Sequence, residues 1–339
     1  MSENTIKMKS LLKKLRLYRV ITILKIIPQY FKKSRKIARE YNLRSLPIYW
    51  DMMRCLMKYG ASDVNYEQYH FWEHDEEYKS SFITWRRNLA IMYKFCTPAS
   101  KELFLDKVVW NKRFAKYVKR DWIYCKESSL ETIQGFLHKY DDVIVKSIDG
   151  ACGVGIDKYK AIDVLNDKSL LASLVGGNVI LEEVAVNAEA IRQFSPQSLN
   201  TFRFVTCIDK SGVPHIIATA FRMGNGESHT DNICTGGIAC YVDSETGIVV
   251  TDGLNVQGKF FIEHPYSKKT FKGFKIPNWD EARKLVLDLA MEVPEARFVG
   301  WDVVLTENGF DILEGNIPPD EALTELDMSG KYHKVMSMY

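Results

Sequence analysis

The chain has 339 residues, 46% hydrophobic and 26% charged, and this composition excludes a disordered chain. No apolar run approaches the roughly 20 residues that a membrane-spanning helix needs. The early apolar stretch leads into a basic segment rather than into the small residues of a signal-peptide cleavage site. We therefore expect a cytoplasmic protein of about two globular units. Its seven cysteines lack metal-binding spacing and are expected to be reduced.

The net charge of +3 conceals two regions of opposite sign. Residues 1–60 hold 15 Lys and Arg against 3 Asp and Glu, a net charge of +12, whereas the remainder carries −9. Between Leu11 and Ile27, apolar residues recur at three- and four-residue spacings, separated by Lys and Arg, as in an amphipathic helix. Two interpretations stay open: residues 1–40 lie on an anionic membrane as a peripheral attachment, or the helix packs on its own enzyme. Nucleic-acid binding is not expected, because no recognition motif is present and the rest is acidic.

In chain order, a mainly helical region extends to about residue 95. Helices are then expected at 101–120 and 130–139, with an extended segment at 122–125. Two runs rich in β-branched residues, 143–146 and 156–159, flank a glycine-rich turn and predict a hairpin. The remaining expected elements are strands at 179–185, 202–208, 214–222 and 237–242, a helix at 279–292, and a closing hairpin at 298–316.

The closing hairpin brings two carboxylates together. A three-residue loop of Glu307, Asn308 and Gly309 would pair Asp302 with Glu314. Opposed carboxylates repel unless a cation lies between them, and Mg²⁺ prefers such oxygen ligands. A two-residue Asn308-Gly309 loop would send the acids to opposite faces, so spacing alone leaves the metal site open. With the three-residue loop, one face of the hairpin would carry Asp302, Val304, Thr306, Phe310, Ile312, Glu314 and Asn316.

Several motifs occur in the order of a known nucleotide site. Lys146 in VIVKSIDGACGVGI, Glu182-Glu183 in VILEEVAV, and the acids of WDVVLTENGFDILEGN resemble the ATP-grasp superfamily. SPQSLNTFRFVTCID, FRMGNGESHTDNICTGGIACYVDSETG and HPYSKKTFKGFKIPNWDEA resemble its sugar-transfer-associated branch, found with polysaccharide biosynthesis genes. The resemblance covers about residues 101–320. It implies an α+β ATP-grasp fold: a basic helical region (1–95), then a small lid subdomain (96–184) and a larger antiparallel-sheet subdomain (185–339) that clasp ATP.

The resemblance also implies roles for single residues. Lys146 and Lys107 would contact ATP phosphates, although Lys112 could be confused with Lys107, and backbone amides of the glycine-rich turn would close over them. Adenine would lie at the strand that carries Glu182, and the ribose at Glu189, although plain surface charge explains either glutamate equally well. The implied nucleotide residues are Lys107, Lys146, Gly150, Gly153, Glu182, Glu183, Ala185 and Glu189, and the implied Mg²⁺ ligands are Asp302, Glu314 and Asn316.

Two arginines are expected in central strands. Guanidinium groups are uncommon there unless they bind an anion, so Arg203 and Arg222 are assigned to phosphate or to an acyl-phosphate. The alternative is an ion pair with Glu182 or Asp231. Many ligases of the superfamily place an arginine where this chain has Gly300, so one of the two takes that role or the chemistry differs. On the acceptor side, polar residues followed by glycines suit a ligand-contacting loop: Asp231, Asn232, Gly236 and Gly237.

The implied function is an ATP- and Mg²⁺-dependent carboxylate–amine ligase that forms an amide through an acyl-phosphate. By family context the acid would be a uronic-acid sugar or an amino acid for a capsule or O-antigen. A lipid-linked sugar would explain the basic start, and polysaccharide-assembly enzymes are possible contacts. Two alternatives remain. One is a sugar phosphotransferase with His215, His229 or Asp231 as base, and the other is a nucleotide-binding module that recruits a glycosyltransferase without catalysis.

Overall fold

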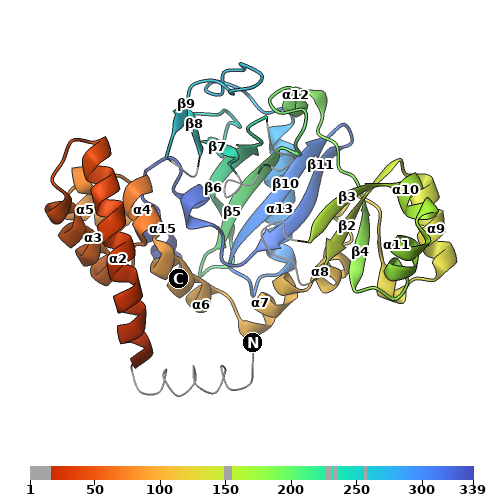
Figure 1. Cartoon of the computed structure of the whole chain (residues 1–339), viewed down its shortest axis with the longest axis horizontal. Coiled ribbons are helices and arrows are strands. Elements are labelled where there is room, and N and C mark those ends of the chain that lie inside the picture. The colour runs from red at the N-terminus through yellow and green to blue at the C-terminus, as the bar shows by residue number, and fades with distance from the viewer. Residues whose placement is uncertain (1–16, 149–154, 227–230, 232–235, 256–257) are drawn as a thin grey trace. The chain divides into compact units, whose positions relative to one another are not determined.

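The structure, a computed structural model, describes residues 17–148, 155–226, 231, 236–255 and 258–339 (Figure 1). It divides into two compact units, Met1–Arg87 and Asn88–Tyr339. The described part of the first unit is helical, as expected for this region, and α6 (Trp85–Phe95) crosses the boundary. Its other elements are α2 (Leu17–Glu40), α3 (Ser45–Tyr59), α4 (Asp63–Gln68), η1 (Phe71–Glu73) and α5 (Glu76–Ser81).

The helix expected at 101–120 is two shorter helices, α7 (Pro98–Leu105) and α8 (Lys107–Arg113). Asp106 separates them, because its carboxylate accepts the backbone N–H groups of Val108 and Val109 at 2.9 and 3.0 Å. An aspartate is more stable as such an N-cap than in a helix interior, which is why the prediction of one long helix was wrong.

The smaller sheet of the second unit has the antiparallel order β1-β4-β2-β3. The predicted hairpin around the glycine-rich turn is confirmed as β2 paired with β3. Val143 and Leu181 face a cluster with Ile133 and Phe136 of α9, and Lys146 and Glu182 occupy the opposite face. The elements are β1 (Trp122–Tyr124), η2 (Cys125–Glu127), α9 (Leu130–Lys139), β2 (Asp142–Ser147), β3 (Ile156–Lys160), α10 (Ala161–Asn166), α11 (Lys168–Leu174) and β4 (Val179–Glu183).

The larger sheet has the order β11-β10-β5-β6-β7-β8-β9, with every pair antiparallel. Helix α13 covers one face, where Trp279 stacks on Phe204 with ring centroids 5.1 Å apart (Figure 1). The predicted strands and the helix at 279–292 are confirmed, but α12, β8, β9, α14 and α15 were not predicted. The elements are α12 (Glu189–Arg192), β5 (Thr201–Ile208), β6 (Pro214–Met223), β7 (Ile238–Tyr241), β8 (Gly253–Asn255), β9 (Phe260–Phe261), α13 (Trp279–Glu292), β10 (Phe298–Thr306), β11 (Gly309–Asn316), α14 (Glu321–Thr324) and α15 (Tyr332–Ser337).

The closing hairpin pairs Asp302 with Glu314 as predicted, but by a different route. Thr306 pairs with Gly309, so the loop has two residues rather than three. A register shift between Asp302 and Val303 then leaves Leu313 as an extra residue on β11. This β-bulge restores the pairing of the two acids, which the shorter loop alone would have lost.

The bulge also corrects the predicted hairpin face. Phe310 and Ile312 do not share a face with Asp302 but belong to the hydrophobic core with Val303 and Leu305. Asp311, paired with Val304, takes their place on the side of the acids. The strand thus packs apolar residues on one face near its turn and presents polar residues on the other face near its end.

Candidate active site

A row of alternating charges lies on the face of the large sheet that carries Asp302. The Arg203 guanidinium, directly opposite on β5, binds both Asp302 carboxylate oxygens, with Nη2 to Oδ2 at 2.9 Å. Arg222 of β6 lies between two acids, with Nη1 3.4 Å from the Asp302 carboxylate and Nη2 3.1 Å from Asp231 Oδ1. The ion pair with Asp231, which was the alternative to phosphate binding, is therefore present for Arg222, and Arg203 instead pairs with Asp302.

The charges in this row control each other's ionisation. Burial alone would raise the pKa of Asp302, but Arg203 and Arg222 outweigh it and lower that pKa to about 2. Desolvation would likewise lower the pKa of Arg222, yet Asp231 and Asp302 raise it. Asp302 and Arg222 are therefore ionised at neutral pH, and the two guanidinium groups are held at the centre of the sheet.

Glu314 differs from Asp302 because it is open to solvent and lacks such close cationic partners. Partial desolvation and the charge of Asp302 raise the pKa of Glu314. Asn316 lies two residues further along β11, with its Nδ2 3.4 Å from Glu314 Oε1. A cation near Glu314 would relieve this repulsion, so the residues fit Mg²⁺. Among the described residues, no group of three or more His, Cys, Asp or Glu could hold a metal alone, so an amide and phosphate oxygens would have to complete the ligand set.

Gly300 lies close to the Arg203 side chain. A Cβ atom at Gly300 would lie 3.0 Å from Pro319 Cβ and 3.2 Å from Arg203 Cδ. The Arg203 side chain therefore occupies the space above Gly300, and a side chain on residue 300 would collide with it. The guanidinium reaches the same face from the neighbouring strand.

Gly300→Ala is expected to lower turnover about tenfold and stability by about 1–3 kcal/mol, because the added methyl group displaces Arg203 or Pro319. ADP release and thermal unfolding measure the two effects. The matched control is Gly135→Ala in α9, where a Cβ would meet nothing within 4 Å. Equal behaviour of the two variants would contradict the packing argument.

The small sheet carries charged residues on the face opposite its hydrophobic cluster. Lys146 forms an ion pair with Glu182, which is buried, and Glu182 lies 3.7 Å from Arg120 Nε. Burial tends to raise the pKa of Glu182, but Lys146 and Arg120 lower it. Arg120 Nη1 also donates to Asp311 Oδ2 at 2.6 Å. Arg120 thus joins the small sheet to β11 at the edge of the site.

Arg120 and Asp311 were missed by sequence reasoning. Arg120 precedes a short strand in no recognised motif, and Asp311 was placed on the wrong face because the bulge was not predicted. The change from apolar Phe310 and Ile312 to polar Glu314 and Asn316 at the same parity was the available signal, since an unbulged strand would put all four on one face.

The sequence left Lys107 and Lys112 as alternatives for one phosphate contact, and the two side chains have different partners in the structure. Lys107 Nζ donates to the carbonyl oxygens of Ser147 and Ile148, at 2.8 and 3.2 Å, where the glycine-rich turn begins. Lys112 is exposed and pairs with Glu127 at 2.9 Å. Lys107 thus lies beside the start of the glycine-rich turn, and Lys112 pairs elsewhere, while Gly150 and Gly153 lie outside the described residues.

The remaining nucleotide residues differ in exposure. Glu183 points to the other face of β4 from Glu182, where its Oε2 accepts the Asp121 N–H at 3.1 Å. Ala185 follows the strand and is half-buried. Glu189 begins α12, is exposed and pairs with Arg192. Glu183 is therefore turned away from the site, and Glu189 is accessible.

Of the residues expected to contact an acceptor, the structure describes Asp231, Gly236 and Gly237. Asp231 is held by Arg222 and Thr201, and Gly236 and Gly237 lead into β7, whereas Asn232 lies outside the described residues. Gly224 precedes the loop that contains these residues, and its carbonyl accepts a hydrogen bond from His264 Nε2 at 2.6 Å. Nε2 is the donor because Nδ1 of His264 accepts the N–H groups of Tyr266 and Ser267.

This buried histidine makes stability depend on pH. Desolvation lowers the pKa of His264 below its ordinary value. The unfolded chain then binds more protons, so stability is full above about pH 6.5 and is lost as pH falls below it, by up to about 1.4 kcal/mol per pH unit. Thermal unfolding between about pH 7 and pH 5 should show this slope, and His264→Gln should flatten it. An equal slope in the variant would assign the effect to other groups.

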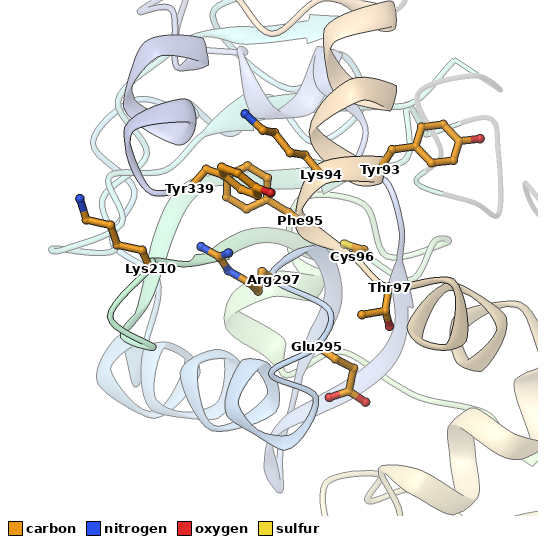
Figure 2. Close-up of a pocket in the computed structure, with 9 residues that line it drawn as sticks. All are labelled: Tyr93, Lys94, Phe95, Cys96, Thr97, Lys210, Glu295, Arg297 and Tyr339. Carbon is orange, nitrogen blue, oxygen red and sulfur yellow. The ribbon is translucent and has the colours of Figure 1, made fainter.

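A separate cavity of about 670 Å³ lies at the other end of the central strands. Figure 2 shows it beside Arg297, which precedes β10, and Lys210, which follows β5. Arg297 is already engaged by the carbonyls of Ile208 and Met338 at 2.9 and 2.8 Å. None of the predicted site residues lines this cavity. His215 also belongs to this end, where it contacts Asp209 at 2.8 Å, so it is remote from Asp302.

Comparison with known proteins adds a family match. A family model described as sugar-transfer associated ATP-grasp matches residues 93–335. No curated protein matches the sequence.

Several solved structures are similar at low identity. ATP-grasp ligase PsnB complexed with minimal precursor is 11% identical, over 72% of this chain and 64% of PsnB, with a TM-score of 0.46. D-alanyl-alanine synthetase A from Vibrio cholerae O1 biovar eltor is 12% identical, over 66% of this chain and 57% of that one, with a TM-score of 0.39. D-cycloserine synthetase DcsG is 12% identical, over 70% of each chain, with a TM-score of 0.41. The match spans 54–64% of the PsnB chains.

Proposed function

This chain belongs to the sugar-transfer associated ATP-grasp family, and on that premise we propose that it is an ATP- and Mg²⁺-dependent carboxylate–amine ligase. Its α+β ATP-grasp fold follows a helical N-terminal region. We assign nucleotide binding to both its sheets, with 96–184 as the lid subdomain and 185–339 as the larger one.

The observation that carries the proposal is the carboxylate pair Asp302 and Glu314 beside two buried arginines. Such a set provides oxygen ligands for a divalent cation and planar donors for phosphate oxygens in one place. A purely structural ion pair would need one acid for one base. Here Arg203 is engaged by Asp302, and Arg222 is shared between Asp302 and Asp231, so Glu314 adds a negative charge that a bound cation would balance.

The proposed reaction transfers the γ-phosphoryl group of ATP to a substrate carboxylate, and an amine then displaces phosphate to give an amide, ADP and inorganic phosphate. Bound Mg²⁺ supplies Lewis-acid stabilisation of phosphate charge, with Asp302, Glu314 and Asn316 as its ligands. Arg203 and Arg222 orient the transferring group and stabilise its charge. Lys107 and Lys146 bind phosphates, and Glu182, the Ala185 backbone and Glu189 hold the nucleoside.

The acceptor and the cellular setting are finer parts of the same proposal. The loop that contains Asp231 receives a uronic-acid sugar or an amino acid for a capsule or O-antigen. A lipid-linked acceptor agrees with the basic N-terminal region, and residues 1–40 then attach the protein to the inner face of the plasma membrane. Within the described residues, no helix has the length and apolar character to cross a bilayer.

The decisive experiment is Mg²⁺-dependent release of ADP and phosphate from the full chain, with panels of uronic-acid sugars and amines tested singly and in pairs. Stimulation only by a paired acid and amine, with equal ADP and phosphate, is the expected result. ADP without free phosphate would replace the ligase with a sugar phosphotransferase. No turnover, together with retained nucleotide binding, would leave a binding module that recruits a glycosyltransferase.

A further inference from the structure

The outward face of α3 is apolar, which is unusual for a helix at a protein surface. Helix α3 already buries one apolar face, formed by Ile48, Met52, Cys55, Leu56 and Tyr59. On the opposite side, Leu46 is 60%, Trp50 67% and Met57 81% exposed. These three, with Met53, recur at spacings of four, three and four residues and so form one stripe. A helix that is apolar on both faces needs a second partner for the exposed one.

The stripe continues onto α2 through aromatic contacts. Phe31, itself 42% exposed, meets Tyr49 with ring centroids 5.9 Å apart, and Tyr49 meets Trp50 at 5.3 Å. Ile27 is exposed one turn before Phe31. We call this continuous surface the α2–α3 face, formed by Ile27, Phe31, Leu46, Tyr49, Trp50 and Met57.

Exposed cations occur on α2 and directly before α3, the two helices that form the face. Lys32, Arg35, Arg39 and Arg44 are exposed, and among the residues that the structure describes none of the four has an acidic oxygen within 4 Å. The Arg35 guanidinium lies 5.8 Å from the Phe31 ring centroid, at the edge of the apolar surface. The positive charge is therefore available to an external partner.

We propose that the α2–α3 face lies on an anionic lipid surface, with Trp50, Phe31 and Met57 at the level of the headgroups. Aromatic and aliphatic side chains with a basic border match that interface, where apolar groups insert and Lys or Arg contact anionic headgroups. A second copy of the chain is a poorer occupant, because residues 1–60 carry +12 and two such regions repel. The inference rests on the proposed peripheral attachment but assigns it to folded residues of α2 and α3.

The test is binding of the full chain to phosphatidylcholine vesicles with and without phosphatidylglycerol, followed by co-sedimentation. Wild-type protein should bind the anionic vesicles and bind neutral ones much less. Trp50→Glu with Met57→Glu should weaken binding at least about tenfold, since both side chains lose apolar burial. Ile162→Glu with Val213→Glu also adds two charges, at positions that are 59% and 48% exposed and lie outside the face, and this matched control should bind as wild type.

Fluorescence separates insertion from simple attraction. Trp50→Phe should keep vesicle binding but lose part of the blue shift in tryptophan emission, whereas Trp50→Glu should lose both. Because the substituted side chains are exposed, the unfolding transitions should match wild type, and ADP release from soluble substrates should be unchanged. That readout keeps a failed membrane proposal distinct from a failed ligase proposal.

Three results would overturn the inference. Wild-type protein that ignores anionic vesicles would exclude a lipid surface. Unchanged binding by the Trp50→Glu, Met57→Glu variant, with loss on replacing Lys9, Lys13 and Lys14 by Glu, would place attachment in the first segment alone. A dimer in sedimentation that the α3 variant dissociates would make the face a contact between copies.

Discussion

Glu314→Gln is expected to lower Mg²⁺-dependent ADP release about a hundredfold to a thousandfold, because it removes a metal ligand that also balances charge in the transferring state. The same change should raise the free energy of unfolding of the ligand-free protein by about 1 kcal/mol, since it removes a carboxylate that opposes Asp302. Gain of stability with loss of activity is the signature of a residue kept for function.

Steady-state ADP release and thermal unfolding with and without Mg²⁺ and ATP measure both effects. Wild-type protein should be stabilised by the added ligands, and the variant should respond much less. Glu245→Gln is the control, because this glutamate is exposed and pairs only with Arg283 and so should behave as wild type. A variant of Glu314 that turns over normally would remove Glu314 from the metal site.

Much of the fold could be predicted from local pattern. Strand alternation and turn glycines located β2 to β7 and the closing hairpin, because each run is long enough to show its period. β8 has three residues and β9 two, which is too short for any period to appear. The break in the helix at Asp106 could have been predicted, since an aspartate before an apolar run is an N-cap signal.

The pairing of Asp302 with Glu314 could be predicted, because both residues lie on strands joined by a short turn. The detail of the candidate site depends on conflicts that only tertiary packing resolves. Along β11, core packing needs Phe310 and Ile312 inward, and the site needs Glu314 and Asn316 outward, although all four positions have the same parity. The bulge at Leu313 satisfies both demands. Arg120 has no comparable local signal, since its partners Glu182 and Asp311 are distant in sequence.

Arg203→Ala is expected to destabilise the protein by about 3–5 kcal/mol and to reduce turnover about a hundredfold or more. The side chain binds both oxygens of a buried carboxylate, and its removal leaves Asp302 with Arg222, whose Nη1 is 3.4 Å away. Arg203→Lys should recover part of the stability, because an ammonium keeps the charge but cannot form the paired hydrogen bonds. Chemical denaturation and ADP release measure the two losses.

A second substitution tests whether the lost stability comes from charge balance. In Arg203→Ala, Asp302→Asn, the uncompensated carboxylate is gone, so most of the lost stability should return, while turnover should remain as low as in either single variant. Arg113→Ala is the control, since this arginine makes a surface ion pair with Glu292 at 3.6 Å and should change stability by less than about 1 kcal/mol. If stability did not return in the double variant, the loss in Arg203→Ala would come from packing rather than from the uncompensated carboxylate of Asp302.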